Sequence, residues 1–351
     1  MPAIAVADAL RDSGRAAVSC LGTRERAEAE LVPAAGYEID FLRVSGLDRR
    51  NPLKAAAAMG RAVAAVPAAR RVLRERGADV VVGGGGYVAG PAGLAATRLG
   101  LPLVLTEADS HLGLANRMLA RRARRVCLAF PIEGREGEPY VVTGRPVPKA
   151  ILEADPVTAR RRFGVPRSDP CITVFGGSIG ALTVNEAAFE AFGGEGGARG
   201  PGAPWVIHIA GRRDYPELKR RWEQAGGAER YLLREYEPTL AEPLAACDLV
   251  VARAGGSVME IAAAGRPAIL VPYPHATADH QTTNARWMHD GGAAEVIPDS
   301  ELTAERLGQA AQALLRDPDR LAEMSAASRR LALPDAAQRI ASEVLSAAGA
   351  R

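Results

Sequence analysis

The sequence of 351 residues is long enough to form two domains, each with its own hydrophobic core. A hydrophobic fraction of 48%, a charged fraction of 24% and a net charge of +3 without runs of like charge are ordinary for a globular protein and give no indication of nucleic-acid binding. The four cysteines lie in separate apolar, strand-like segments such as 16–22, which favours reduced thiols in a cytoplasmic protein. Neither an apolar stretch of about 18 residues nor a signal peptide is present, so we expect no membrane span and no export.

Short strand-like runs alternate with helical segments along the first half of the chain. Strands are predicted where apolar and β-branched residues gather, at 37–44, 78–84, 101–107, 124–130 and 139–144. Between them, the Ala- and Arg-rich segments 54–75 and 112–123 have helical periodicity.

The second half repeats this alternation. Strands are predicted at 171–177, 204–211, 231–236, 248–255, 267–273 and 293–299. A final amphipathic helix is predicted within 333–349. Strand–helix alternation predicts parallel sheets covered by helices on both faces, and one sheet of this length would be unusually large. We therefore expect an α/β protein of two doubly wound domains, with the boundary near 143–156, where prolines follow a strand.

Three glycine-rich turns join a strand to a helix, at 80–96, 171–187 and 248–265. In the first of them the helix is expected to open at Gly90–Pro91. Such turns free backbone N–H groups at a helix N-terminus, where they bind phosphate or pyrophosphate. None matches a P-loop or a dinucleotide fingerprint, so either a tight turn alone or a diphosphate-bearing ligand explains each of them. Two such turns in the second half favour the ligand.

Ser257 and Glu260 allow two interpretations. The spacing S-x-x-E before an apolar run predicts a capping box, in which Glu260 reaches back to the backbone N–H of Ser257. Alternatively, the Glu260 carboxylate binds a pair of vicinal hydroxyls, such as those of a ribose.

The stretch 272–285, PYPHATADHQTTNA, follows a predicted strand and leads into a predicted helix. It therefore lies where open α/β sheets bind ligands. Its residues His275, His280, Asp279 and Gln281 are compatible with a metal site, an acid–base pair or a grip on a polar ligand. A metal site is disfavoured, because no third ligand stands at helical spacing.

Several of these segments together resemble the MurG family, the peptidoglycan N-acetylglucosaminyltransferases of glycosyltransferase family 28. The segments are RAGGSVMEIAAAGRPAILVPYPHATADHQTTNA, GGSIGA with a later Asn-Glu, GGYVAGPAGLAA, GTRERAEAELVPAAGYEI and GLANRMLARRARRV. The resemblance implies a GT-B fold, in which two Rossmann-like domains face a cleft and the C-terminal helix crosses back to the first domain. It implies an acceptor-binding, membrane-facing domain at 1–146 with 333–351, and a UDP-sugar donor domain at 147–332.

The resemblance also implies a reaction. N-acetylglucosamine would pass, with inversion and without a metal or cofactor, from UDP-N-acetylglucosamine to undecaprenyl-pyrophosphoryl-MurNAc-pentapeptide, turning lipid I into lipid II in peptidoglycan synthesis. The protein would be peripheral, on the cytoplasmic face of the cell membrane, and its partners would be these two substrates and an anionic membrane surface.

Site residues follow from the same resemblance. Ser178 would contact the donor pyrophosphate or its neighbourhood, Glu260 the ribose, and Gln281 the sugar hydroxyls. Gly177, beside Ser178, would also bind the donor. The backbone near Tyr236 and Glu237 would frame the uracil. The remaining implied residues are Gly255, Gly256 and Ser257 on the donor, and Gly85, Gly86 and Tyr87 on the acceptor loop.

The sequence departs from the family pattern at its start and in the first domain. The family has a strand and a glycine loop ending in histidine, the usual general base, just ahead of the segment PAIAVADAL, and we expect these to be encoded upstream of Met1. Where the family commonly has His-Glu-Gln-Asn, residues 106–109 of this chain are Thr-Glu-Ala-Asp. Only Glu107 keeps its identity, and Asp109 replaces a donor-binding asparagine. Pro148 replaces an arginine. Within this chain the substitutes for the base are Glu107, Asp109 and His111, although His111 is also explained as a polar residue at a helix start.

Two alternative functions remain open from the sequence: a UDP-sugar-binding paralogue without catalysis, and a transferase for a different glycolipid acceptor. For membrane attachment, the segments 51–77 and 112–126 combine apolar and basic residues. Either they bind anionic lipid together, or they are solvated faces of ordinary amphipathic helices.

Overall fold

The structure is a computed structural model that describes residues 2–45, 52–177, 180–194, 202–276 and 279–349. The chain divides into two compact units, one of residues 1–147 with 333–351 and the other of residues 148–332. All strand pairs of the described residues are parallel, as the alternation of strands and helices predicted. None of the described helices has the length and apolar character needed to cross a bilayer.

The first unit contains two parallel sheets. Its strands are β1 (Ser19–Gly22), β2 (Glu38–Phe41), β3 (Val81–Gly83), β4 (Leu103–Glu107), β5 (Arg125–Leu128) and β6 (Tyr140–Val142). β1 pairs with β2, and the other four form a sheet in the order β3-β4-β5-β6. Its helices are α1 (Pro2–Asp12), α2 (Glu28–Ala34), α3 (Pro52–Ala64), α4 (Val66–Glu75), α5 (Gly86–Arg98), α6 (Leu114–Leu119) with the 3₁₀ turn η1 (Ala120–Arg122), and α16 (Ala336–Gly349).

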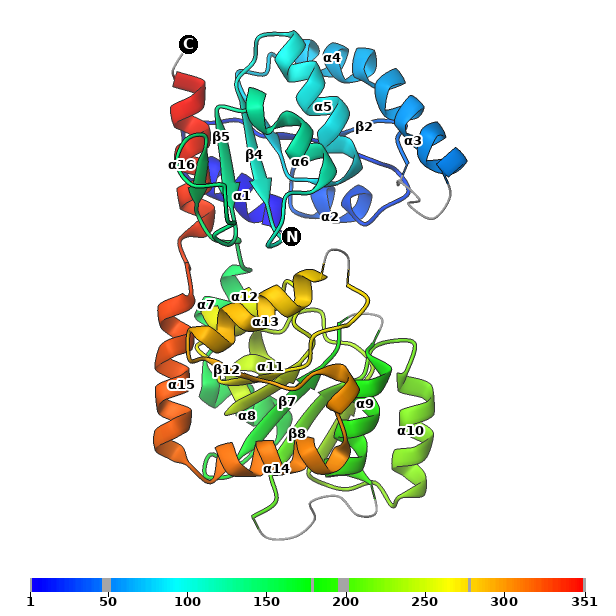
Figure 1. Cartoon of the computed structure of the whole chain (residues 1–351), viewed down its shortest axis with the longest axis vertical. Coiled ribbons are helices and arrows are strands. Elements are labelled where there is room, and N and C mark those ends of the chain that lie inside the picture. Colours follow the sequence, from blue (N-terminus) through cyan, green and yellow to red (C-terminus); the bar gives the residue numbers. More distant parts are fainter. Residues whose placement is uncertain (1, 46–51, 178–179, 195–201, 277–278, 350–351) are drawn as a thin grey trace. The chain divides into compact units, whose positions relative to one another are not determined.

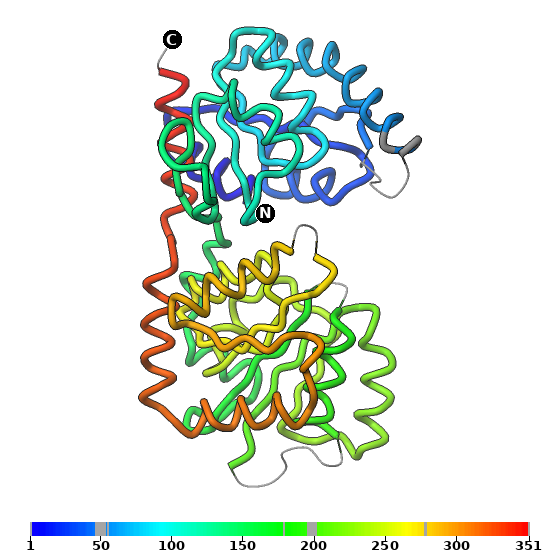
Figure 2. Tube along the Cα trace, in the orientation of Figure 1, coloured from blue at the N-terminus to red at the C-terminus, as the bar shows by residue number. Residues whose placement is uncertain are grey.

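Helices join the two sheets of the first unit into one folded body. On one face, Val6 and Leu10 of α1 pack with Val104 and Cys127 of the four-stranded sheet, and the same helix packs with Tyr37 beside β2. α16 packs on α1 and on β4 and β5, and Figure 2 shows it as the last, red stretch of the trace. The C-terminal helix therefore belongs to the first unit.

The second unit contains one six-stranded parallel sheet in the order β12-β11-β10-β7-β8-β9. Figure 1 labels β7, β8 and β12 of this sheet. Its strands are β7 (Cys171–Phe175), β8 (Trp205–Ile209), β9 (Tyr231–Arg234), β10 (Leu249–Ala252), β11 (Ala268–Leu270) and β12 (Ala294–Val296). Its helices are α7 (Lys149–Glu153), α8 (Pro156–Phe163), α9 (Leu182–Ala188) with a π-helical turn (Phe189–Gly193), α10 (Tyr215–Gln224), α11 (Ala241–Ala246), α12 (Val258–Ala263), α13 (His280–Asp290), the 3₁₀ turn η4 (Asp299–Glu301), α14 (Ala304–Leu315) and α15 (Pro318–Leu331).

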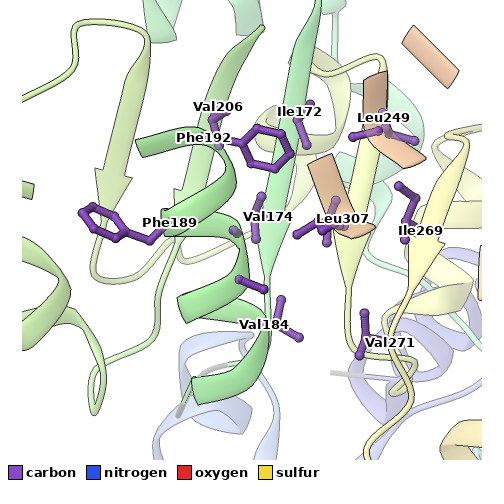
Figure 3. Close-up of a cluster of buried hydrophobic side chains, with 14 of the residues drawn as sticks. Ile172, Val174, Val184, Phe189, Phe192, Val206, Leu249, Ile269, Val271 and Leu307 are labelled. Carbon is purple, nitrogen blue, oxygen red and sulfur yellow. The ribbon is translucent and has the colours of Figure 1, made fainter. Parts of the chain in front are cut away.

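The core of this unit explains why its strands read as continuous apolar runs. β7 and β10 are central, and each of their residues is buried. Figure 3 shows Ile172 and Val174 of β7 beside Leu249 of β10 and Val184 and Phe192 of the following helix. A parallel strand covered on both faces has no solvent side, so its sequence does not alternate.

Candidate functional site

The glycine turn after β7 is held in a conformation that only glycine permits. Gly177 and Gly180 have φ angles of 104° and 107°. A Cβ on Gly176 would lie 2.2 Å from Cβ of Ala181, so any side chain at 176 would push the turn away from α9. Ser178 lies outside the described residues, so its predicted contact with the pyrophosphate stays a prediction.

Arg253, at the end of β10, ties this turn to its neighbours. Its guanidinium donates to the Thr183 hydroxyl at 2.6 Å, in the first turn of α9, and to the carbonyls of Val271 and Pro272 at 3.2 and 3.3 Å. It also pairs with Asp299 at 2.5 Å, and its side chain is only 9% exposed. A buried cation with this many partners fixes the relative positions of three loop segments. We did not predict this role, because the sequence gives no sign of which loops an arginine will join.

A chain of buried polar groups lies behind the same turn. The amide Nδ2 of Asn185 donates to the Ala210 carbonyl at 2.8 Å and to Asp214 at 2.9 Å, so its Oδ1 accepts from Nε2–H of His208 at 2.9 Å. The Tyr231 hydroxyl then donates to Nδ1 of His208. Burial lowers the pKa of His208 to about 3, so this ring is neutral. No motif in the sequence predicted this network, because its members come from α9, β8 and β9.

The turn after β10 contains Gly255, Gly256 and Ser257, and the half-buried Glu260 lies in the first turn of α12. The serine half of the predicted capping box is absent, since Ser257 has helical backbone angles (φ −65°, ψ −13°) and its side chain makes no capping bond. An N-cap residue normally has extended angles, which aim its hydroxyl at the first backbone N–H groups. The Ser257 hydroxyl therefore does not cap α12, and the predicted bond from Glu260 to the Ser257 N–H stays a prediction.

Gln281 stands in the first turn of α13 and lies against the Gly255 turn. Its Oε1 accepts from the backbone N–H of Tyr273 at 3.0 Å. Its Nε2 lies 3.9 Å from the position that a Cβ on Gly255 would take. One end of the amide is thus fixed by the loop after β11, and the other end faces the glycine turn after β10.

The two histidines of 272–285 do not form a metal site in the part of the chain that the structure describes, where no group of three or more His, Cys, Asp or Glu side chains could hold an ion. The exposed His275 ring packs edge-on against Tyr273, with centroids 5.5 Å apart. Asp279 adopts a left-handed conformation (φ 51°) and accepts from the Thr282 hydroxyl at 2.6 Å, which begins α13.

Tyr236 and Glu237 follow β9, farther along the same sheet. Tyr236 is exposed, with the Arg212 guanidinium 4.8 Å above its ring. The Glu237 carboxylate accepts from Arg162 of α8 at 2.9 Å and its side chain is 5% exposed. This ion pair fixes the loop, and the predicted contact of its backbone with uracil stays a prediction.

The structure therefore brings the predicted donor residues to one edge of the second unit. β7, β10 and β11 are neighbours in the sheet, and the turns after them carry Gly177, Gly255 and the segment up to Gln281. All three turns follow the carboxyl ends of parallel strands, where open α/β sheets bind their ligands.

In the first unit, a glycine turn follows β3. Gly85 and Gly86 have φ angles of 78° and 72°, and α5 begins at Gly86. The helix was expected to open at Gly90–Pro91, which is wrong: the two left-handed glycines complete the turn, and Pro91 lies inside the helix. Tyr87 is exposed, and the Arg26 guanidinium lies 5.1 Å above its ring.

Glu107, at the end of β4, holds the loop that follows it. It is buried, and its carboxylate accepts from the backbone N–H of Gly113 at 2.8 Å, from Asn116 at 2.9 Å and from the backbone N–H of Asp109 at 3.2 Å. Both oxygens are thus used within the loop. Asp109 and His111 lie in this loop and are half-buried.

Comparisons with known proteins agree over nearly the whole chain. Residues 1–128 match the glycosyltransferase family 28 N-terminal domain, and residues 171–340 match the corresponding C-terminal domain. A UDP-N-acetylglucosamine--N-acetylmuramyl-(pentapeptide) pyrophosphoryl-undecaprenol N-acetylglucosamine transferase from Halorhodospira halophila is 41% identical, over 97% of this chain and 92% of its own. A protein of the same name from Alkalilimnicola ehrlichii is 42% identical, over 97% and 93%. The crystal structure of Acinetobacter baumannii MurG has a TM-score of 0.76 at 29% identity, covering 98% of this chain and 95% of that one.

Proposed function

Because the chain belongs to glycosyltransferase family 28, we propose that it transfers N-acetylglucosamine from UDP-N-acetylglucosamine to the lipid-linked MurNAc-pentapeptide named in its relatives. The observation that carries the proposal is the convergence of Gly177, Gly255 and Gln281 at one sheet edge in a chain with this sequence identity to such transferases. The products are UDP and the lipid-linked disaccharide peptide.

On the donor, the turn after β7 binds the pyrophosphate with backbone N–H groups near Gly177, together with Ser178. Glu260 accepts hydrogen bonds from the ribose hydroxyls, near Gly256 and Ser257. Gln281 donates through Nε2 to a hydroxyl of the sugar, while Tyr273 holds its other amide atom. The backbone at Tyr236 and Glu237 meets the uracil. Arg253 acts through Thr183 and the loop after β11 and touches no substrate.

On the acceptor, the start of α5 binds the pyrophosphate. The backbone N–H groups that follow Gly85 and Gly86 are unused by the first helical turn, and the helix dipole favours an anion there. Tyr87 borders this position.

Among residues 1–351, the group that accepts the proton of the attacking hydroxyl is assigned to the loop after β4. Glu107 is better placed to position this loop than to accept a proton, because its oxygens already accept three hydrogen bonds. We therefore place the base at Asp109 or His111. Asp109→Asn or His111→Gln, whichever removes the base, should lower kcat at least 100-fold with the donor KM unchanged. Full activity in both variants would overturn this assignment.

Transfer of radiolabelled N-acetylglucosamine tests the proposed activity directly. The expected result is label in the lipid fraction that depends on the lipid-linked MurNAc-pentapeptide and releases UDP. Binding of UDP-N-acetylglucosamine without transfer to any acceptor would mean a sugar-nucleotide-binding protein instead. Transfer to another glycolipid but not to this acceptor would mean a transferase of different specificity.

A lipid-linked acceptor also requires contact with a membrane surface, which we assign to the first unit at the cytoplasmic face of the cell membrane. α3 and α6 both pack on α5, and these three helices carry exposed apolar side chains: Met59, Val63, Tyr87 and Met118. Arg121 and Arg122 are exposed and follow Met118 by about one helical turn, so they lie beside it. Exposed apolar side chains with arginines beside them favour reversible binding to anionic lipid.

Two residues of the predicted basic segment do not take part. Arg125 pairs with Glu138 at 2.9 Å and with Glu343 of α16 at 3.0 Å, so it joins β5 to the C-terminal helix. Leu119 is 4% exposed and packs in the core. The sequence could not show these two roles, because the partners of Arg125 and the core contacts of Leu119 come from residues far away in the chain.

A further inference from the structure

A pocket of about 850 Å³ lies at the end of the two-stranded sheet of the first unit. Arg24 and Glu25 line it from the turn after β1, and the segment from Leu42 to Ser45 lines it after β2. Arg61 of α3 completes the lining. The pocket is therefore built from the carboxyl ends of parallel strands, the position of ligand sites in α/β folds.

The charge of the pocket favours an anion. Three guanidinium groups line it, from Arg24, Arg43 and Arg61. Of the two carboxylates in the lining, Asp40 accepts from Arg76 at 2.8 Å, so only Glu25 offsets the three cations. In the part of the chain that the structure describes, none of these three arginines forms an ion pair.

The pocket is also partly apolar and partly preorganised. Ile39, Phe41 and Val44 contribute apolar surface to the lining. Arg24 stacks 4.8 Å above the Phe41 ring, and Arg61 donates two bonds to the Ser45 hydroxyl, at 3.0 and 2.8 Å. An arginine that is already oriented loses less side-chain entropy when it binds a carboxylate, and its planar fork matches both carboxylate oxygens. Apolar surface beside fixed guanidinium groups suits a peptide that carries carboxylates.

A contact across the unit relates this pocket to the acceptor turn. Arg26, next in the chain to the lining residue Glu25, stacks on Tyr87 at 5.1 Å, and Tyr87 lies in the first turn of α5. The carboxyl ends of β1 and β3 therefore adjoin, although the two strands belong to different sheets. The Arg26–Tyr87 contact thus links the start of α5 to the turn that lines the pocket, and the peptide is the other anionic part of an acceptor whose pyrophosphate lies at α5.

We propose that this arginine pocket binds the carboxylates of the acceptor's peptide and so selects peptide-bearing acceptors. The inference rests on the proposed function for the identity of the acceptor, and it adds the part of the acceptor that these residues recognise. Arg43 and Arg24 form the ion pairs with the peptide, and Arg61 holds Ser45 at the rim.

Equilibrium binding tests the pocket independently of turnover. A fluorescent acceptor analogue with a short lipid chain is titrated with the full chain, once with free peptide carboxylates and once with these carboxylates amidated. Arg43→Ala should weaken binding of the free-carboxylate analogue about 10-fold, or about 1.4 kcal/mol. The same variant should bind the amidated analogue within about twofold of the wild type. Arg43→Lys keeps the positive charge but lacks the planar guanidinium. Its affinity for the free-carboxylate analogue should lie between those of Arg43→Ala and the wild type.

The matched control is Arg98→Ala, which removes the same charge from the last turn of α5, at the opposite end of that helix. It should bind both analogues as the wild type does. An equal loss of affinity for both analogues in Arg43→Ala would mean that the pocket binds the pyrophosphate. No loss of affinity for either analogue would mean that the pocket binds neither the pyrophosphate nor the peptide. Both results overturn the proposal. Absence of sugar transfer with this binding pattern intact would overturn the proposed function alone.

Discussion

The side-chain amide of Gln281 has a defined orientation, because the loop after β11 uses one of its two polar atoms. Gln281→Glu keeps an oxygen for the Tyr273 N–H and replaces the Nε2 donor by a second oxygen. Loss of a donor to the sugar should raise the KM for UDP-N-acetylglucosamine about 10-fold, while inhibition by UDP changes less than about twofold. Initial rates at varied donor concentration give both quantities. Unchanged donor kinetics in this variant would refute the assignment of Gln281 to the sugar.

Glu260→Ala is the informative partner of that variant. Because Glu260 is assigned to the ribose, which UDP and UDP-N-acetylglucosamine share, its loss should weaken both ligands by the same factor. A variant that is less stable yet binds UDP normally would favour a role in helix capping instead. Comparing the two variants separates recognition of the sugar from recognition of the nucleotide.

From the sequence, it was easier to predict which residues lie near the site than to predict what each of them does. Glu107 was a candidate base because it lies in the same strand-to-helix loop as Asp109 and His111, yet it accepts three hydrogen bonds from that loop. Those bonds depend on where Gly113 and Asn116 lie after folding, which no spacing rule encodes. For Ser257 the spacing fits an N-cap residue, but its backbone angles are helical and its side chain makes no capping bond.

The buried network of β8, β9 and α9 should make the stability of the protein depend on pH. The pKa of His208 is lowered by burial from 6.5 to about 3, so below pH 6.5 the unfolded chain binds a proton that the folded chain does not. Stability is therefore lost as the pH falls from 6.5 toward 3, at up to about 1.4 kcal/mol per pH unit from this one group. Denaturant unfolding at several pH values between 7 and 4.5 measures the slope.

His208→Gln removes this titration and keeps a donor and an acceptor in the network. The variant should be less stable at pH 7, and its free energy of unfolding should fall less steeply below pH 6.5. His275→Gln, at an exposed ring, is the matched control. An unchanged slope in His208→Gln would show that another group carries the pH dependence.

The strands of both units could be predicted because apolar runs bounded by glycine and proline repeat along the chain. The arginine pocket and the Arg253 cluster could not, since their members are far apart in sequence and meet only through the parallel order of the strands. The start of α5 was missed because Pro91 looked like a first helical residue, whereas the left-handed Gly85 and Gly86 had already turned the chain.

For the whole molecule, the net charge of +3 is too small to attract a membrane strongly, so local charge should decide binding. We predict that the protein sediments with anionic vesicles and not with neutral ones, and that high salt releases it, because each arginine near the surface contributes about 1 kcal/mol and is screened beyond about 8 Å at physiological salt. Arg121→Glu with Arg122→Glu should abolish this binding. Arg316→Glu with Arg320→Glu, which makes the same change of charge in the second unit, should leave it intact. Equal binding by the two double variants would show that net charge governs the association, and not the arginines beside Met118.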